Sequence, residues 1–326
     1  MTEKQIELIM ANISEKISDN IKPVEYLMTV LNIGKESAYR RMRGEIPFTF
    51  DEISELSLKL GFSVDEIIGK NMEERVFFDL QVNSSSRADE SFLSMLEEYY
   101  KYMEIITSSP NVEVMASLNR ISLVMFIEFD SLFKLYYYNW IHQTSNVSLN
   151  HLFSDTVVPY NIMELRKKFI VQKKNLNNLN LIIDREIFLT TVREIQYYYN
   201  RKLITEEDVL VLKEELISLL KKIEIMMQRG TNDYGSTCNY YLSLLDVETN
   251  TNCSTSDNNI ASLYWLYPVN VIAIYNQEIC YMQKKWTESL KKFSVLITLS
   301  NEILQAEFIA KQKEFIEDIT NELYHY

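Results

Sequence analysis

Glycine and proline are scarce in this sequence. The chain of 326 residues contains only six glycines and five prolines. All-β folds and dinucleotide-binding folds use glycine freely in turns and phosphate loops. The scarcity therefore argues against both classes and favours long helices, so we predict a mostly α fold.

Cysteine and histidine are also rare, with three residues of each. The cysteines are odd in number and contain no close pair, which argues against a disulfide framework. The histidines show no metal-ligand spacing among themselves or with the cysteines. Because no nucleophile elbow, phosphate loop or dinucleotide fingerprint occurs either, we predict no catalytic residues, no metal and no cofactor, and we expect that the protein is not an enzyme.

Long apolar runs are missing as well. The apolar stretch at residues 121–127 is far too short to cross a bilayer, and the first residues begin an amphipathic pattern without an apolar signal segment. We therefore expect a cytoplasmic protein without membrane contact. The net charge of −13 counts against a general nucleic-acid coat protein, but it allows a small DNA-reading head whose positive charge is local.

The first 69 residues carry the start and stop signals of five short helices. These signals are an isoleucine stripe at helical spacing, a proline at a helix start, glycines at helix ends and two capping boxes. The predicted helices span residues 5–18, 24–31 and 35–43, and begin after the capping boxes Thr49/Glu52 and Ser63/Glu66.

The stretch from Val24 to Gly44 has the pattern of a helix-turn-helix. Two helices are joined by the three-residue turn Asn32-Ile33-Gly34, and Gly44 ends the second helix. Apolar residues stand where the helices must pack, and the small side chain of Ala38 permits a close approach. We predict that the second helix is a recognition helix.

The opposite face of this recognition helix presents side chains that can reach base edges and phosphates in a major groove. Residues 35–43 contain four basic residues and one acid, whereas residues 1–75 contain ten basic and fourteen acidic residues. The positive charge is therefore focused on one helix. The residues on this face are Lys35, Glu36, Tyr39, Arg40 and Arg43.

Residues 5–69 resemble the lambda-repressor/Cro family of helix-turn-helix domains. The turn, the glycine after the recognition helix and the closing segment LGFSVDEII at 60–68 carry the resemblance. Met28 stands where the family usually has alanine, and Asn32 replaces the usual turn glycine. The resemblance implies a five-helix DNA-binding domain and double-stranded DNA as partner, with the backbone at Val24 starting the helix that abuts phosphate. It also implies base-reading positions at Lys35, Glu36, Ser37 and Arg40.

The remainder of the chain predicts a second, larger domain. We assign residues 1–75 to the DNA-binding domain, 76–90 to a polar linker and 91–326 to a helical dimerisation or effector domain. The exception is 237–274, where two apolar stretches flank a polar loop and predict a small β-hairpin. Helices are predicted near 88–107, 112–143 (broken near Arg120), 160–177, 184–201, 205–229, 275–297 and 301–323.

The predicted helix at 205–229 repeats apolar residues at intervals of seven over about three heptads. This pattern indicates either a dimerisation helix or a core helix of a bundle. The apolar face is wider than a coiled-coil seam, which favours the core helix. A homodimer is still expected, because two recognition helices about one turn apart match a near-palindromic operator.

The sequence as a whole predicts a sequence-specific DNA-binding transcriptional regulator. Its C-terminal domain would serve oligomerisation or the sensing of an unknown small-molecule or peptide effector. Two alternatives remain open. One is a peptide- or ligand-responsive regulator whose C-terminal region is a helical-repeat array, and the other is a protein-interaction scaffold that has lost DNA binding.

Overall fold

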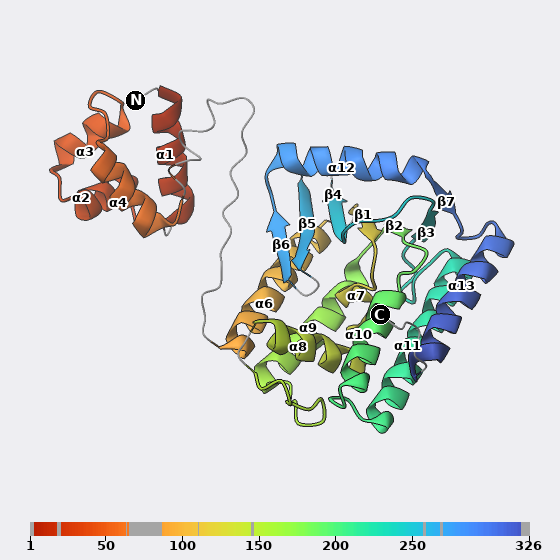
Figure 1. The fold of residues 1–326 in the computed structure, drawn as a ribbon. Helices are drawn as coiled ribbons and strands as arrows, with labels where there is room; N and C mark the ends of the chain where they lie inside the picture. The colour runs from red at the N-terminus through yellow and green to blue at the C-terminus, as the bar shows by residue number, and fades with distance from the viewer. Residues whose placement is uncertain are drawn as a thin grey trace. The chain divides into compact units, whose positions relative to one another are not determined.

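The chain divides into two compact units, Met1–Gln81 and Val82–Tyr326, which are described separately (Figure 1). None of the described helices combines the length and apolar character that crossing a membrane requires. The computed structural model describes residues 3–17, 21–62, 64, 87–109, 111–144, 147–256, 259–267 and 270–320.

The N-terminal unit contains four described helices. The predicted fifth helix, after Ser63, lies outside the described residues, as do residues 76–86 of the predicted linker. Residues 88–90 of that linker already belong to a helix of the second unit. The four helices are α1 (Glu3–Lys16), α2 (Pro23–Leu31), α3 (Lys35–Met42) and α4 (Phe50–Leu60).

A small apolar core holds these four helices together. Each helix contributes a side chain with no exposed surface, namely Ile9 and Ile13 from α1, Leu27 from α2, Ala38 from α3 and Leu56 from α4. Since Ala38 is small, α3 can approach its partners closely. The sequence placed Leu27 and Ala38 in this contact, and their burial is confirmed.

The second unit is not the helical domain with a small hairpin that the sequence predicts. It contains a seven-stranded mixed sheet with the order β6-β5-β4-β1-β2-β3-β7. The adjacent strands β1, β2 and β3 run parallel, and the other neighbours are antiparallel. The strands are β1 (Glu113–Leu118), β2 (Leu179–Ile183), β3 (Cys238–Ser243), β4 (Thr251–Thr255), β5 (Ile260–Tyr267), β6 (Asn270–Ile274) and β7 (Ser294–Leu296).

The prediction of a mostly α fold is wrong where strands form through contacts between distant segments of the chain. Strand β1 lies inside the predicted helix 112–143 and contains methionine, alanine and leucine, which are good helix formers. Buried parallel strands read as short apolar runs without alternation, so periodicity does not reveal them. The predicted hairpin at 237–274 is also wrong, because β3 pairs with β2 and β7 rather than with β5.

Helices cover both faces of the sheet (Figure 1). Two crossovers join the parallel strands, from β1 to β2 through α7, α8, α9 and η1, and from β2 to β3 through α10 and α11. The helices are α6 (Ala88–Thr107), α7 (Leu123–Phe126), α8 (Asp130–Thr144), α9 (Tyr160–Gln172), α10 (Leu189–Asn200), α11 (Glu206–Arg229), α12 (Gln277–Lys292) and α13 (Glu302–Glu317), with the 3-10 turns η1 (Lys173–Asn175) and η2 (Asp318–Thr320).

Alternation along the strands separates the two covered faces. Ala116 of β1 pairs with Leu181 of β2, and both line a space beneath α11. The neighbouring residue Ser117 points to the other face, where its hydroxyl bonds to Thr251 over 2.8 Å. Gln283 of α12 donates to the same Thr251 hydroxyl over 2.7 Å. Successive strand residues face opposite sides, so α11 and α12 lie on opposite faces of the sheet.

Helix α11 is a core helix of this unit. Its heptad residues Val209, Leu212, Leu216, Leu219 and Ile223 are all buried in the large hydrophobic core. Thr205 and Asp208 form a capping box at its start. The apolar stripe is therefore used inside the unit, and α11 gives no support to the dimerisation alternative.

Gly44 provides a test of the packing between α1 and the end of α3. Its φ is +73°, and a Cβ atom there would lie 2.9 Å from Ile6 Cδ1, whereas Gly61 (φ +63°) meets no atom of the described residues within 4 Å. We expect Gly61→Ala to destabilise the N-terminal unit by about 1 kcal/mol through backbone strain, and Gly44→Ala by slightly more, about 1.5 kcal/mol, because the terminal methyl group of Ile6 must also move. Hydrogen exchange of amides in 21–62 measures both effects. Equal losses would show that the Ile6 contact has no energetic weight.

Candidate functional site

The predicted recognition helix is α3, and its boundaries follow from local backbone geometry. Asn32 ends α2 in the left-handed conformation with φ +51°, as its replacement of the family glycine requires. Gly34 is the N-cap of α3 in extended conformation, and Gly44 follows the helix with positive φ. Met28, the other departure from the family pattern, is partly buried against the core of the unit.

Five of the six predicted site residues lie together on the exposed side of α3. Lys35, Glu36, Tyr39, Arg40 and Arg43 are all exposed, whereas Ala38 on the opposite side has no exposed surface. This arrangement is the one that a helix needs to enter a major groove. The described residues of the N-terminal unit therefore leave this face accessible to a partner.

The sixth predicted residue, Ser37, is engaged inside the unit. Its hydroxyl accepts a hydrogen bond from Arg41 Nη1 over 2.6 Å. The Arg41 guanidinium also binds both carboxylate oxygens of Glu52, with Nη2 at 2.7 Å and Nε at 3.0 Å. Arg41 therefore joins α3 to α4, and Ser37, which bonds to Arg41 within α3, does not belong to the exposed face.

Glu52 serves two helices at once. Its carboxylate accepts from the backbone N–H of Thr49 over 2.9 Å, while its own N–H donates to the Thr49 hydroxyl over 3.2 Å. Burial opposes ionisation of Glu52, but the Arg41 and Thr49 hydrogen bonds outweigh burial and lower its pKa. The predicted capping box of α4 is thus confirmed, and the same carboxylate fixes the orientation of α3.

Glu45 is a functional neighbour that the sequence argument missed. Its carboxylate accepts from Arg43 Nε over 2.6 Å and from Arg40 Nε over 3.3 Å. The hydrogen bond from Arg43 lowers the pKa of Glu45, and the same bond raises the pKa of Arg43. The charge count of the recognition helix covered residues 35–43. Extending it by two residues would have included Glu45, which directly follows Gly44.

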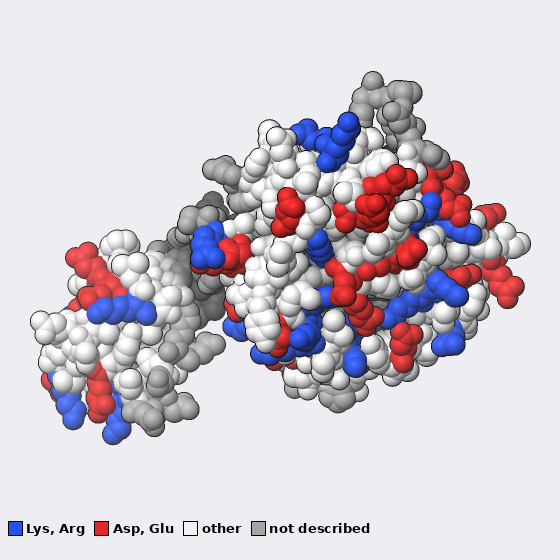
Figure 2. Space-filling view, turned by 90° about the horizontal axis from the view of Figure 1, so that it is seen from below, with Lys and Arg blue, Asp and Glu red and all other residues white. Residues whose placement is uncertain are grey.

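The exposed face therefore carries less positive charge than the sequence predicts. Lys35, Arg40 and Arg43 stand against Glu36 and Glu45, which leaves a net charge of three minus two, or +1. Exposed ion pairs are weak in water, so a phosphate or a guanine edge can replace Glu45 as the partner of either guanidinium. Figure 2 shows basic side chains next to acidic ones on both units, with no continuous basic surface on the face shown.

The start of α2 offers a second possible contact with a phosphate. Pro23 is at the first turn, and the N-cap Lys22 makes no side-chain capping hydrogen bond. Helix N-termini attract anions through their backbone N–H groups and dipole. The position agrees with the phosphate contact that the family resemblance implies for the backbone at Val24.

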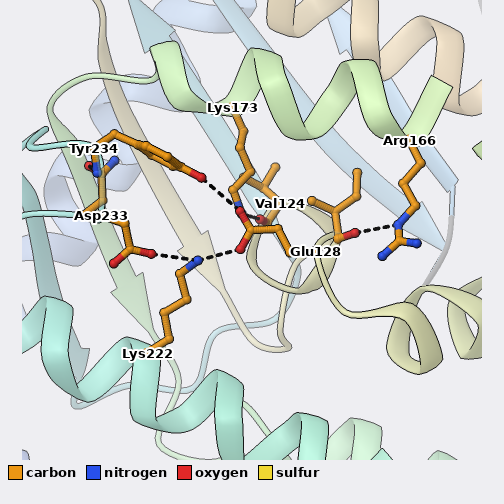
Figure 3. Close-up of polar contacts among 9 residues, drawn as sticks. Val124, Glu128, Arg166, Lys173, Lys222, Asp233 and Tyr234 are labelled. Atoms are coloured by element: carbon orange, nitrogen blue, oxygen red, sulfur yellow. Dashed lines mark hydrogen bonds and ion pairs between the residues drawn. The ribbon is translucent and has the colours of Figure 1, made fainter. Parts of the chain in front are cut away.

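A partly buried polar cluster stands out in the second unit (Figure 3). The Glu128 carboxylate, between α7 and α8, binds Lys222 of α11 over 2.5 Å and Lys173 of η1 over 3.1 Å. Lys222 also binds Asp233 over 2.9 Å, and the Tyr234 hydroxyl donates to Glu128 over 3.1 Å. The two lysines approach Glu128 from opposite sides, so this carboxylate links three separate segments.

Charge balance keeps this cluster ionised. Burial favours the neutral form of Glu128, but the two lysines outweigh that effect and bring the pKa of Glu128 to about 2. Lys173 is 9% exposed, and this burial lowers its pKa although Glu128 opposes the shift. Two ammonium groups and two carboxylates leave the cluster without net charge. Arg166 holds the same segment by donating to the Ile127 carbonyl over 2.7 Å (Figure 3).

Two histidines without ligand spacing in the sequence lie close together in this unit. The rings of His142 and His151 are 6.1 Å apart, and both contact Tyr138. His325 lies outside the described residues, and the described part of the chain contains no group of three or more potential metal ligands.

The Glu128 cluster predicts a specific dependence of stability on pH. The lowered pKa means that Glu128 stabilises the fold above its ordinary pKa of about 4.5, and that this stabilisation is lost as the pH falls towards about 2. We expect Glu128→Gln to reduce the free energy of unfolding at pH 7 by about 2 kcal/mol and to differ less from wild type as the pH falls below 4.5. All three tryptophans lie in the second unit, so urea unfolding followed by tryptophan fluorescence measures this unit alone.

Glu164→Gln is the matched control for this prediction. Glu164 pairs with Lys167 at the surface over 2.7 Å, and exposed pairs contribute little to stability. A loss as large for Glu164→Gln as for Glu128→Gln, or a Glu128 effect that does not change with pH, would contradict the assigned role.

Comparisons with protein-family models, with curated proteins and with solved structures found no match. The functional assignment therefore depends on the residues and distances described above.

Proposed function

We propose that the protein is a cytoplasmic, sequence-specific DNA-binding transcriptional regulator that reads base edges with α3. The observation that carries this proposal is the exposed side of α3, where Lys35, Arg40 and Arg43 surround Tyr39. Cationic and hydrogen-bonding side chains of this kind, on a short helix supported by two others, suit recognition in a major groove. The resemblance of residues 5–69 to the lambda-repressor/Cro family supports the same assignment.

Each exposed side chain can be given a role in this mechanism. The planar guanidinium groups of Arg40 and Arg43 match guanine O6 and N7 or a phosphate, and Glu36 can accept from a cytosine amine. Lys35, at the start of α3, is suited to a phosphate or a base edge. Ser37 is removed from the set, because it bonds to Arg41 within the unit.

The proposal includes a homodimer on a near-palindromic operator. Two-fold symmetry of an operator places two recognition helices about one helical turn apart. The heptads of α11 no longer support dimerisation, since they are buried in the core of the second unit. The dimer therefore follows only from the expected geometry of the operator.

The structure argues against one of the two alternative functions and leaves the other open. The helical-repeat regulator is abandoned, because the second unit is built on a seven-stranded sheet rather than on stacked helix pairs. The interaction scaffold keeps one specific observation in its favour, namely that Glu45 already pairs with Arg40 and Arg43. A scaffold of this kind would bind a protein through the same face.

Selection of bound fragments from random DNA at moderate salt tests the proposal. We expect an enriched motif for the full-length chain, and Arg40→Ala to lose about 1–3 kcal/mol of specific affinity and to relax one base preference. Lys59→Ala is the matched control, because it removes the same charge from the exposed surface of α4. An absence of any enriched motif would favour the scaffold, and unchanged binding by Arg40→Ala would refute the assigned face.

A substitution of Glu45 tests the proposal through an expected increase in DNA affinity. Glu45→Gln frees Arg40 and Arg43 for phosphate, so we expect DNA affinity to rise about two- to fivefold and the dependence on salt to steepen by about 0.9 in log–log slope for each new phosphate contact. Glu55→Gln removes the same charge from α4, where Glu55 pairs with Lys59, and should change binding less. Equal effects of both substitutions would mean that Glu45 acts only through net charge.

A further inference from the structure

The second unit contains an apolar cavity of about 120 Å³ between its sheet and its helices. Strands β1 to β5 form one side of the cavity, and α6 and α11 contribute much of the other. For comparison, an engineered apolar cavity of roughly 150 Å³ stays dry and binds benzene. The cavity is therefore large enough for one small molecule.

Small side chains on the sheet create this space. Ala116 of β1 and Cys238 of β3 line the cavity, and each pairs with a leucine of β2, Ala116 with Leu181 and Cys238 with Leu179. Leu179 and Leu181 of β2 are only partly buried, although β2 lies between two other strands beneath α11. Their remaining exposed surface indicates that the helices above them do not fill the interior.

Polar groups in the cavity are few and suit an uncharged partner. Tyr99 is 1% exposed and lines the cavity. Its ring meets Trp265 edge to face with centroids 5.9 Å apart, which gives the cavity an aromatic wall. The Asn252 side chain also lines the cavity, and its oxygen accepts from Tyr102 over 2.5 Å.

The charged groups at the cavity already satisfy one another. Lys173, Lys222 and Asp233 line it, and with Glu128 they form the balanced cluster of Figure 3. A charged ligand would have to break these pairs or leave its own charge without a partner, and both are unfavourable in apolar surroundings. A neutral ligand requires neither change.

We propose that this cavity binds an uncharged, compact molecule about the size of a benzene ring that carries one hydroxyl or amine group. The apolar body lies between the Ala116–Leu181 surface of the sheet and Ile223 of α11, and the polar group bonds to the Tyr99 hydroxyl. A cavity of this volume excludes a peptide. That the ligand is the effector of a DNA-binding regulator rests on the proposed function, whereas its binding to the cavity does not.

Titration of the full-length chain with phenol, benzene and benzoate tests the binding. The melting temperature and the tryptophan fluorescence are measured at each concentration. We expect phenol and benzene to raise Tm with a shift that grows with the logarithm of concentration, and benzoate to have no effect. Tyr99→Phe removes only the hydroxyl, so it should weaken phenol binding about fivefold and leave benzene binding unchanged. Binding of benzoate in preference to phenol, or of none of the three, would overturn the proposal.

Two further variants locate the ligand. Ala116→Leu fills the cavity and should abolish the Tm shift of phenol. If Ala116→Leu does not fold, Ile223→Ala takes its place: it enlarges the cavity and should admit the larger ring system of indole, which the wild type excludes. Unchanged phenol binding in a folded Ala116→Leu, or no gain of indole binding in Ile223→Ala, would exclude this cavity as the site.

The DNA experiment separates the two proposals. An enriched DNA motif without phenol or benzene binding would refute the cavity site alone, and ligand binding without a motif would refute only the regulator. With both present, we expect saturating phenol to change operator affinity at least threefold in the wild type and not in Ala116→Leu. An operator affinity that phenol leaves within experimental error would refute the effector role.

Discussion

The bidentate pair between Arg41 and Glu52 determines what α3 presents to a partner. Glu52 is held by the capping box of α4, and this contact orients its carboxylate towards Arg41. Because Arg41 must turn towards α4, residues Arg40 and Arg43 turn outwards on the same helix. The core contact at Ala38 sets the distance of α3 from its partners, and the ion pair sets its rotation. One basic residue thus supports the surface that its two neighbours form.

Local signals in the sequence were sufficient for several of the helices. The predicted helix at 88–107 agrees with α6, and that at 205–229 with α11. Helical periodicity is a local signal in both, and a capping box also marks the start of α11. The same holds for Asn32, whose left-handed conformation could be expected from its side chain. For the candidate site, five of the six residues on α3 were correctly expected to be exposed.

The remaining features depend on residues that are far apart in the chain. Strand β1 has a sequence that suits a helix, and only its pairing with β2 and β4 makes it a strand. Ser37 was assigned to the DNA-reading face because its spacing fits, but its hydroxyl bonds to Arg41, and Arg41 is turned towards α4 by Glu52. The cavity could not be predicted at all, since Tyr99, Ala116 and Trp265 meet only when the sheet is complete.

The sheet also changes what kind of sensing the second unit can perform. A repeat array binds along an extended groove, whereas a sheet covered by helices on both faces can enclose a small molecule in its interior. A ligand there alters a distant site only if it binds two conformations with different affinity. In this unit Glu128 joins the α7–α8 segment to α11 and η1 next to the cavity. A shift of α11 or η1 on ligand binding would have to lengthen or break these ion pairs, which makes the Glu128 cluster the part of the structure where two such conformations would differ first.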